Sequence, residues 1–187
     1  MAIELANHIY RDGEGVPVVL MNAYPVDHRM WDVCAKALAD SADLNDVPDF
    51  PIWAPDMAGS GASPVPSDAD SGPRMANGAY SEALDRLAGA YVDLIKAAGY
   101  EQAIWVGLSM GGGLAQTVAI EHPRRVASLT LIATSPVGLA AGSDLPGMSD
   151  EVQAEFGGLH EPDWADRSAV VEYLVELERL CAARTQP

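Results

Sequence analysis

Hydrophobic residues along this chain of 187 residues gather into short runs. In the segments between the runs, single hydrophobic residues recur every three or four positions. The runs cover residues 17–21, 52–54, 103–106 and 126–133, and the last of them contains two polar residues, Ser128 and Thr130. Short apolar runs without alternating polar side chains are typical of strands buried on both faces of a parallel sheet. A weaker alternation from Ile3 to Tyr10, followed by the turn sequence RDGEG, predicts an opening strand or hairpin.

The segments with helical periodicity lie between these runs. Asp27 can cap a helix that continues to about residue 39, and a longer helix over residues 79–98 ends at Gly99. The inner face of the first helix is predicted to carry Met30, Trp31, Cys34 and Leu38. A further helix begins at Met110, directly after the third run. Alternating strands and helices predict an α/β fold whose mostly parallel sheet is covered on both faces.

The pattern changes beyond residue 133. Residues 134–147 are small and flexible, and two helices are predicted at 148–156 and 168–183 with no strand between or after them. The second of these helices is amphipathic. Its apolar side carries Val170, Val171, Leu174, Leu177, Leu180 and Cys181. A helical segment therefore follows the predicted sheet.

The sequence Gly-x-Ser-x-Gly at residues 107–111 lies where the third run meets its helix. A serine on such a tight turn adopts a strained backbone, and Gly107 and Gly111 leave room for the strand and the helix to pass closely. The turn pushes the hydroxyl of Ser109 out of the end of the sheet, and the first N–H groups of the helix point back at it. The alternative is a glycine-rich turn in which Ser109 only caps the helix.

The residues GLSMGGG, placed between a strand and a helix, resemble the nucleophile elbow of the alpha/beta-hydrolase family. The segment NAYPVDHRMW at residues 22–31 is similar to the family's oxyanion loop, although Asn22 and Ala23 stand where His and Gly are common. The resemblance implies that Ser109 is the nucleophile and that the backbone N–H groups of Tyr24 and Met110 bind the oxyanion. It also implies a three-layer alpha/beta-hydrolase sheet.

A second loop, Asp-x-x-Gly-x-Gly-x-Ser from Asp56 to Ser63, is similar to a loop of the same family. Its predicted work is local, because Asp56 can accept backbone N–H bonds while Gly59 and Gly61 take conformations denied to larger residues. Asp56 is therefore interpreted as scaffold. His28, in the first turn of the predicted helix, is expected to have a surface or capping role.

The catalytic base is the weak point of the resemblance, which implies the chain order serine, acid, histidine. Only His122 and His160 follow Ser109. His122 comes at the far end of the same helix, about 20 Å away at the rise of an α-helix, and cannot be the base. His160 is a candidate base only if the helical segment holds it, with Asp163 or Asp166 as its partner.

No acid follows the run 126–133, because the next residues are Thr134, Ser135 and Pro136. The simplest interpretation is an N-terminal portion of the family fold. Residues 1–134 would form the core, and residues 135–187 would begin a helical cap or lid. The C-terminal core strands, with the acid and the histidine, would be absent from this chain and would have to come from a missing segment.

The composition of the chain excludes several classes of binding partner. The formal net charge of −16 argues against nucleic acid and anionic membranes, since both require a basic surface. The chain has no membrane-spanning apolar run and no basic and apolar leader, so a cytoplasmic protein is expected. Cys34 and Cys181 lie far apart without metal-like spacing, and free buried thiols are expected. No cofactor and no metal site is predicted.

The favoured function is hydrolysis of a small-molecule ester or lactone through an acyl-enzyme, in a mostly apolar pocket under the cap. The same residues fit esterases, lactonases and iminopeptidases, so they do not select a substrate. One alternative is a non-catalytic protein that binds a ligand or partner. Another is a nucleotide-binding oxidoreductase, because Gly107, Gly111 and Gly113 also match a glycine fingerprint, but that fingerprint belongs on the first strand of a sheet.

Overall fold

The computed structural model describes residues 3–65, 80–137, 149–163 and 165–181. The chain divides into two compact units, residues 1–139 and 140–187. The first unit holds a five-stranded sheet in the order β1-β3-β2-β4-β5. The strands are β1 (Asn7–Arg11), β2 (Val18–Met21), β3 (Ile52–Pro55), β4 (Ala103–Leu108) and β5 (Val126–Ile132). Only the β1–β3 pair is antiparallel.

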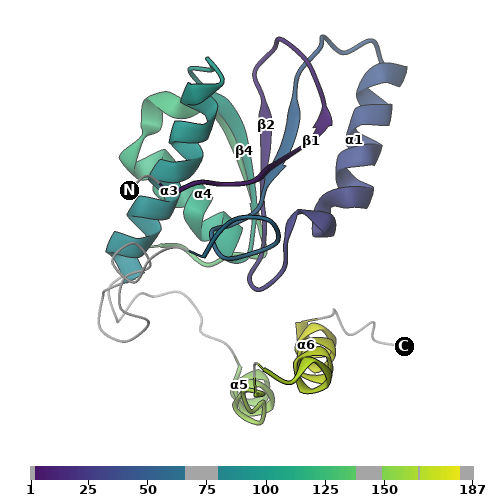
Figure 1. Cartoon of the computed structure of the whole chain (residues 1–187), viewed down its shortest axis with the longest axis vertical. Helices are drawn as coiled ribbons and strands as arrows, with labels where there is room; N and C mark the ends of the chain where they lie inside the picture. The colour runs from purple at the N-terminus through teal and green to yellow at the C-terminus, as the bar shows by residue number, and fades with distance from the viewer. Residues whose placement is uncertain (1–2, 66–79, 138–148, 164, 182–187) are drawn as a thin grey trace. The chain divides into compact units, whose positions relative to one another are not determined.

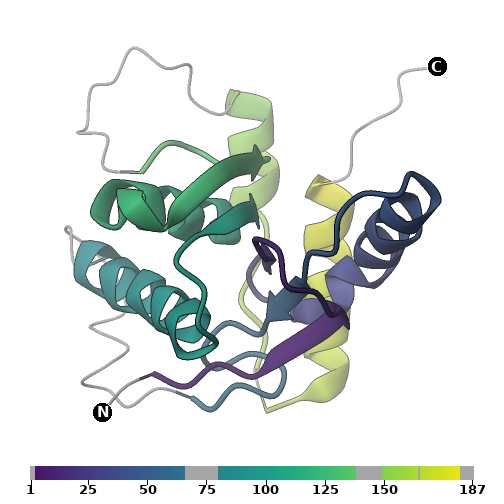
Figure 2. The same ribbon diagram turned by 90° about the horizontal axis from the view of Figure 1, so that it is seen from above.

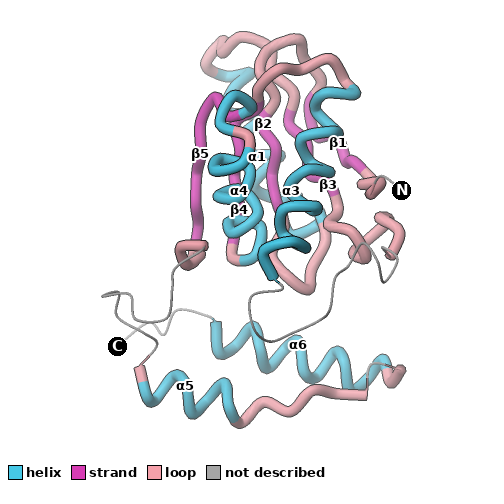
Figure 3. Tube along the Cα trace, turned by 90° about the vertical axis from the view of Figure 1, so that its left-hand side faces the viewer, coloured by secondary structure: helices cyan, strands magenta, loops and turns pink. Residues whose placement is uncertain are grey.

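Helices cover both faces of this sheet. Helix α1 lies on one side of the sheet, whereas α3 and α4 lie on the other (Figures 1 and 2). The helical elements of this unit are η1 (His28–Trp31), α1 (Asp32–Leu44), α3 (Tyr80–Ala97), α4 (Met110–Glu121) and η2 (Pro123–Arg125). Figure 3 shows α3 and α4 running along the strands. The predicted α/β fold with a mostly parallel sheet is confirmed.

Strand β2 explains why the core has two halves. Its four residues are all buried, and successive side chains of a strand point to opposite faces. Val19 and Met21 pack with Trp105 and the α3 and α4 side chains, whereas Val18 and Leu20 pack with Trp31 on the α1 side. An uninterrupted apolar run is therefore the sequence expected of a strand with a helix layer on each face.

The first helix differs from its prediction in phase and length. Asp27 does cap it, but the first turn, η1, is a 3₁₀ turn, and α1 then continues to Leu44. Because a 3₁₀ turn has three residues rather than 3.6, the buried face passes from Trp31 to Ala35 and Ala42. The prediction that Cys34 and Leu38 lie on the inner face is wrong. Both are exposed, so Cys34 is a free thiol but not a buried one.

Two strands depart from their predicted form. Strand β1 begins at residue 7 rather than 3, and it pairs with β3 rather than forming a hairpin with the next strand. Strand β5 was expected to be buried, but Leu131 and Ile132 are 42% and 38% exposed. The reason is its position, because β5 is the edge of the described sheet. The helix predicted over 79–98 matches α3, and Gly99 follows it with a φ of 87°.

The second unit contains α5 (Asp150–Gly157) and α6 (Arg167–Cys181), close to the predicted spans. Asp166 caps α6 by accepting hydrogen bonds from the N–H groups of Ser168 and Ala169, at 2.9 and 3.3 Å. The apolar side of α6 is half-buried, but Val171 is 46% exposed and does not belong to it. The side chain of Cys181 and most of the segment 134–147, which is predicted to be flexible, lie outside the described residues.

None of the helices in the described part of the chain combines the length and the apolarity that crossing a membrane requires.

Candidate active site

Ser109 stands between the end of β4 and the start of α4 with φ 52° and ψ −118°. Residues other than glycine rarely adopt this backbone conformation, which is strained and persists only where the surrounding structure enforces it. The backbone does so through hydrogen bonds from the Ser109 N–H to the Ile132 carbonyl, at 3.0 Å, and from the Gly112 N–H to the Ser109 carbonyl, at 2.9 Å. The residue is exposed, and its side chain makes no capping bond to the helix. The capping alternative therefore has no support in the geometry.

The two glycines that flank Ser109 are needed for close packing. A Cβ at Gly107 would overlap the backbone of Gly111 and Gly112, and a Cβ at Gly111 would overlap the carbonyl groups of Met21 and Asn22. The first turn of α4 thus lies directly against the end of β2. This space is filled by protein backbone, as the tight strand-to-helix turn predicts, and it leaves no room for a pyrophosphate between these glycines and β2.

The loop that carries Tyr24 leaves the same edge of the sheet as Ser109. Strands β2 and β4 are parallel neighbours with Met21 opposite Gly107, so both chains continue from their carboxyl ends side by side. Within the described residues the Tyr24 N–H has no hydrogen-bond acceptor, and its side chain is 57% exposed. The Met110 N–H belongs to the first turn of α4, where no acceptor exists within a helix. Neither predicted oxyanion donor is hydrogen-bonded to another described residue, and the two follow the ends of neighbouring strands.

Asn22, which replaces the family's usual histidine, anchors the start of this loop. It is fully buried, and its amide donates a hydrogen bond of 3.2 Å to the carbonyl of Pro55 at the end of β3. Its own carbonyl oxygen is buried without a partner among the described residues. Further along, the Ala23 N–H contacts the sulfur of Met30 at 3.2 Å. The loop is held by its neighbours on β3 and η1 rather than by the strand alone.

The segment after β5 lies against α4, and its described residues 133–137 include no acid. Gln116 of α4 donates to the Ser135 carbonyl at 2.9 Å and accepts from the Val137 N–H at 3.2 Å. The side chain of Thr134 occupies the space beside Gly112. Within the described residues the Ser109 hydroxyl has no hydrogen-bond partner at all. The absence of a catalytic acid after this strand therefore stays a prediction.

The two histidines that follow Ser109 in the chain are His122, which is excluded as the base, and His160, the candidate base. His122 ends α4 at the opposite end from Ser109, with its N–H bonded to the Val118 carbonyl at 2.8 Å. His160 is exposed and belongs to the second unit, so its role as base stays a prediction. Asp163 and Asp166 accept from backbone N–H groups of their own segment, and no hydrogen bond joins either to His160 in the described part of the chain.

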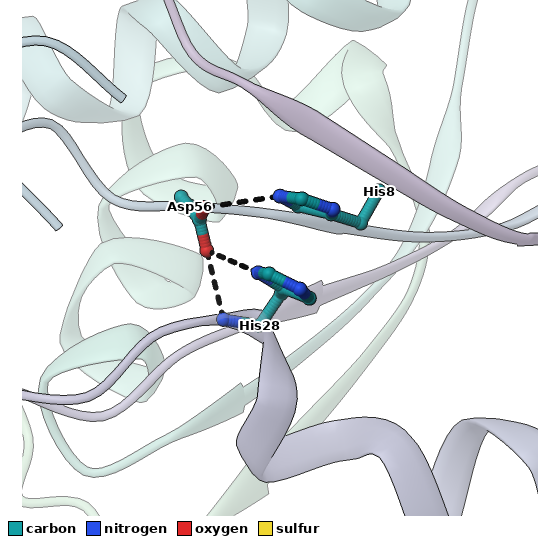
Figure 4. Close-up of side chains that lie close together, drawn as sticks. All are labelled: His8, His28 and Asp56. Carbon is teal, nitrogen blue, oxygen red and sulfur yellow. Dashed lines mark hydrogen bonds and ion pairs between the residues drawn. The ribbon is translucent and has the colours of Figure 1, made fainter. Parts of the chain in front are cut away.

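The structure also assembles a group of side chains that sequence reasoning missed: His8 of β1, His28 of η1 and Asp56 after β3, called here the His–Asp cluster (Figure 4). One oxygen of Asp56 lies 3.0 Å from His8 Nε2, and the other lies 2.8 Å from His28 Nδ1. The two imidazole rings stack with centroids 3.2 Å apart and planes 10° apart. The expectation of a surface or capping role for His28 is wrong, since Asp27 is the cap and His28 faces Asp56.

Asp56 is a saturated acceptor. Besides the two imidazoles it accepts from the backbone N–H of His28 and of Ala62, each at 2.8 Å. Complete burial opposes ionisation, but the Ala62 and His28 N–H groups, with the two imidazoles, lower the pKa of Asp56 below its ordinary value. Gly61, with φ 52°, presses its backbone against this carboxylate. Asp56 therefore does the scaffold work predicted for it, through more partners than the loop alone supplies.

Comparison with known proteins identifies the family to which the chain is similar. A model of the alpha/beta hydrolase fold matches residues 16–177. A pimeloyl-[acyl-carrier protein] methyl ester esterase of Klebsiella pneumoniae is 31% identical over 145 residues, which are 77% of this chain and 46% of that protein. The esterase of the same name from Yersinia enterocolitica is 45% identical over 56 residues, 30% of this chain and 21% of that one.

Two solved esterase structures are similar as well. A thermophilic esterase from Thermogutta terrifontis shares 27% identity at a TM-score of 0.54, covering 82% of this chain and 46% of that one. An esterase from Exiguobacterium antarcticum reaches a TM-score of 0.62 at 21% identity, covering 92% and 57%, and this likeness concerns the fold alone. The chain spans about half the length of the curated relatives that it matches over most of its own length.

Proposed function

The chain belongs to the alpha/beta-hydrolase family, and from that premise we propose that it carries the nucleophile and oxyanion donors for hydrolysis of a carboxylic ester or lactone of a small molecule. The observation that carries the proposal is Ser109, whose exposed hydroxyl stands on a strained strand-to-helix turn. The matched relatives from Klebsiella pneumoniae and Yersinia enterocolitica are named as methyl ester esterases, which favours a carboxylic ester as the bond cleaved.

In the proposed reaction Ser109 Oγ attacks the carbonyl carbon, and the negative charge that develops on the carbonyl oxygen is accepted by the Tyr24 and Met110 N–H groups. Collapse of this intermediate breaks the bond to the leaving alcohol, which departs with a proton, and water then hydrolyses the acyl-enzyme. The attack requires a group that takes the proton from Ser109. None contacts its hydroxyl within the described residues.

We therefore propose that the 187 residues alone are a slow esterase. Without a base in contact, Ser109 keeps a neutral hydroxyl, and catalysis reduces to what the oxyanion donors and binding supply, on the order of 10³ to 10⁴ over water. The partner residues, an acid and a histidine, would come from a further segment of polypeptide. His160 stays the base to replace first if the chain is found to be fast.

Residues 135–187 are proposed to begin the cap over the substrate site. Their two described helices support this, since α5 and α6 follow β5 without a further strand among the described residues. The half-buried apolar side of α6 also supports it, because such a face requires an apolar partner. The residues 1–134 would then be the catalytic core, close to the first compact unit.

The alternative of a non-catalytic protein that binds a ligand or partner is favoured by one observation, the isolated hydroxyl of Ser109. Chemical rescue of esterase activity by imidazole can distinguish the two functions. Imidazole supplied in solution can reach the exposed Ser109 and act as the missing base. If the chain is an esterase, imidazole should raise the hydrolysis of a p-nitrophenyl ester by the wild-type protein well above the rate with the Ser109→Ala variant.

The Ser109→Ala protein sets the baseline, because imidazole hydrolyses such esters by itself. Ser135→Ala is the matched control, since Ser135 is also exposed but does not stand on a strained turn. A fluorophosphonate should label Ser109 before any other serine, as located by mass spectrometry. Equal rescue of wild type and Ser109→Ala, or labelling of another serine, would remove Ser109 as the nucleophile.

A further inference from the structure

We propose that His8, His28 and Asp56 form a binding site for a divalent transition-metal ion, with Zn²⁺ the ion that the three donors fit best. The site is separate from the proposed ester chemistry and does not rest on it. Two imidazole nitrogens and one carboxylate oxygen are a common donor set for Zn²⁺ with an open coordination position.

The donor atoms already converge. One atom of each residue lies within 4.8 Å of the corresponding atoms of the other two. In a tetrahedral zinc site with bonds of about 2.0 Å, the donor atoms stand about 3.3 Å apart. The separations of 3.0 Å from His8 Nε2 and 2.8 Å from His28 Nδ1 run to the two different oxygens of Asp56 and are slightly shorter than this. An ion could bind after the two imidazole side chains rotate out of their parallel stack, so that both nitrogens and one Asp56 oxygen face a common point.

The two imidazoles present the same kind of group to the same carboxylate. Figure 4 shows His8 and His28 lying one above the other, with one ring nitrogen of each directed at Asp56. A carboxylate accepts hydrogen bonds, so without metal each of these nitrogens carries a hydrogen. In the metal-bound form each neutral ring moves its hydrogen to the other nitrogen, and the two lone pairs that face Asp56 become ligands.

The backbone holds the three residues in place independently of any ion. His8 is fixed by the pairing of β1 with β3, where it lies opposite Ala54. The Asp56 N–H donates to the Ala6 carbonyl at 2.9 Å, which ties the loop after β3 to the same strand. Asp56 would also keep its bonds from the His28 and Ala62 N–H groups after the imidazoles turn to the metal. The backbone thus holds the three ligand residues close together, and binding requires a change in the side chains only.

Charge and access favour a cation at this position. Asp56 brings a fully buried negative charge, and the two histidines leave part of the cluster open, with side chains 33% and 20% exposed. The whole chain carries a formal net charge of −16, which raises the local concentration of cations. An ion can reach the imidazole side of Asp56, while the Gly61 backbone closes the other side.

The test replaces the ligands without removing their hydrogen bonds. In the double variant His8→Gln and His28→Asn, amide N–H groups can still donate to Asp56, but amide nitrogens do not bind Zn²⁺. We expect the wild-type chain to bind one Zn²⁺, measured by competition with a chromophoric chelator, and the variant to lose at least about tenfold in affinity. The Co²⁺-loaded wild type should give the intense visible absorption of a tetrahedral site, and the variant should not.

Two matched controls isolate the cluster. His122→Gln with His160→Gln removes the other two histidines of the chain and should leave the Zn²⁺ affinity unchanged. Cys34→Ser with Cys181→Ser removes both thiols and should also leave it unchanged. Absence of stoichiometric binding, loss of binding in either control, or equal affinity in the cluster variant would overturn the proposal and leave the cluster as a hydrogen-bonded clasp only.

A second measurement keeps the test decisive if the cluster variant fails to fold. Two-dimensional NMR of the imidazole nitrogens in wild type reports which histidines bind metal and through which atom. Zn²⁺ should move the signals of His8 Nε2 and His28 Nδ1, while His122 and His160 keep theirs. Shifts confined to His122 or His160, or no shifts at all, would refute the site.

Discussion

The elbow around Ser109 and the His–Asp cluster both lie at the carboxyl ends of parallel strands, after β4 and β3. They are built in opposite ways. At the elbow a residue takes a strained backbone, and its hydroxyl has no partner among the described residues. In the cluster Asp56 is buried and accepts four hydrogen bonds. One region holds a reactive group out of its preferred state, and the other stabilises the loops that surround it. Relief of the strain at Ser109 should therefore raise the stability of the fold, whereas removal of the Asp56 carboxylate should lower it.

The largest effect is expected for Asp56→Ala. This change leaves the part-buried N–H groups of Ala62 and His28 without their acceptor, and an unsatisfied buried group costs about 1 to 3 kcal/mol. We expect a loss of about 3 kcal/mol or more in the free energy of unfolding, measured by urea denaturation. Asp49→Ala is the matched control, because Asp49 is 79% exposed and should matter by less than about 0.5 kcal/mol. Equal costs for the two variants would contradict the stabilising role of the cluster.

Gly111→Ala tests the packing that supports the strained serine. The new Cβ would overlap the Met21 and Asn22 carbonyl groups, so the strand and helix must separate. We expect a loss of about 1 to 3 kcal/mol in stability. Gly89→Ala serves as its control, since a Cβ at Gly89 in α3 meets nothing within 4 Å. That control should be neutral or stabilising, because alanine favours a helix over glycine.

Ser109→Gly should change stability in the other direction. Glycine adopts the φ of 52° without strain, and relief of one strained residue is worth about 1 kcal/mol. Thermal unfolding should show a higher melting temperature for Ser109→Gly than for Ser109→Ala, which keeps a Cβ and therefore the strain. If Ser109→Gly were the less stable of the two, the elbow would not be a strained position.

The smallest effect concerns the helix cap next to the cluster. The Arg29 side chain, against some opposition from burial, lowers the pKa of Asp27 from 3.8 to about 2. Because the folded pKa is the lower one, the charge of Asp27 stabilises the fold above pH 3.8, and this contribution is lost as pH falls through about 2.

Asp27→Asn keeps an oxygen for the cap but removes the charge. It should cost roughly 0.5 kcal/mol at neutral pH. The difference from wild type should shrink as acid denaturation curves are followed toward pH 2. A difference that is constant over this range would show that the charge of Asp27 does not contribute.

The elbow could be predicted because its parts are neighbours in the chain. Apolar runs identified β2, β3 and β4, and the glycines around Ser109 identified the turn, since close backbone approach there requires residues without a Cβ. The alternation of buried residues likewise follows from strand geometry. The local prediction that failed was which side of the first helix faces the core. Nothing in the sequence marked the 3₁₀ turn that moves Cys34 and Leu38 out of the core.

The His–Asp cluster was decided only by the tertiary structure. His8, His28 and Asp56 are separated by 20 and 28 positions, and no spacing rule joins them. They meet because β1 pairs with β3 across the sheet and because η1 follows β2, the neighbour of β3. Periodicity fixes which face of an element is buried, but the order of strands in a sheet depends on the packing of the whole chain. That order, and not any motif, places two histidines on one buried carboxylate.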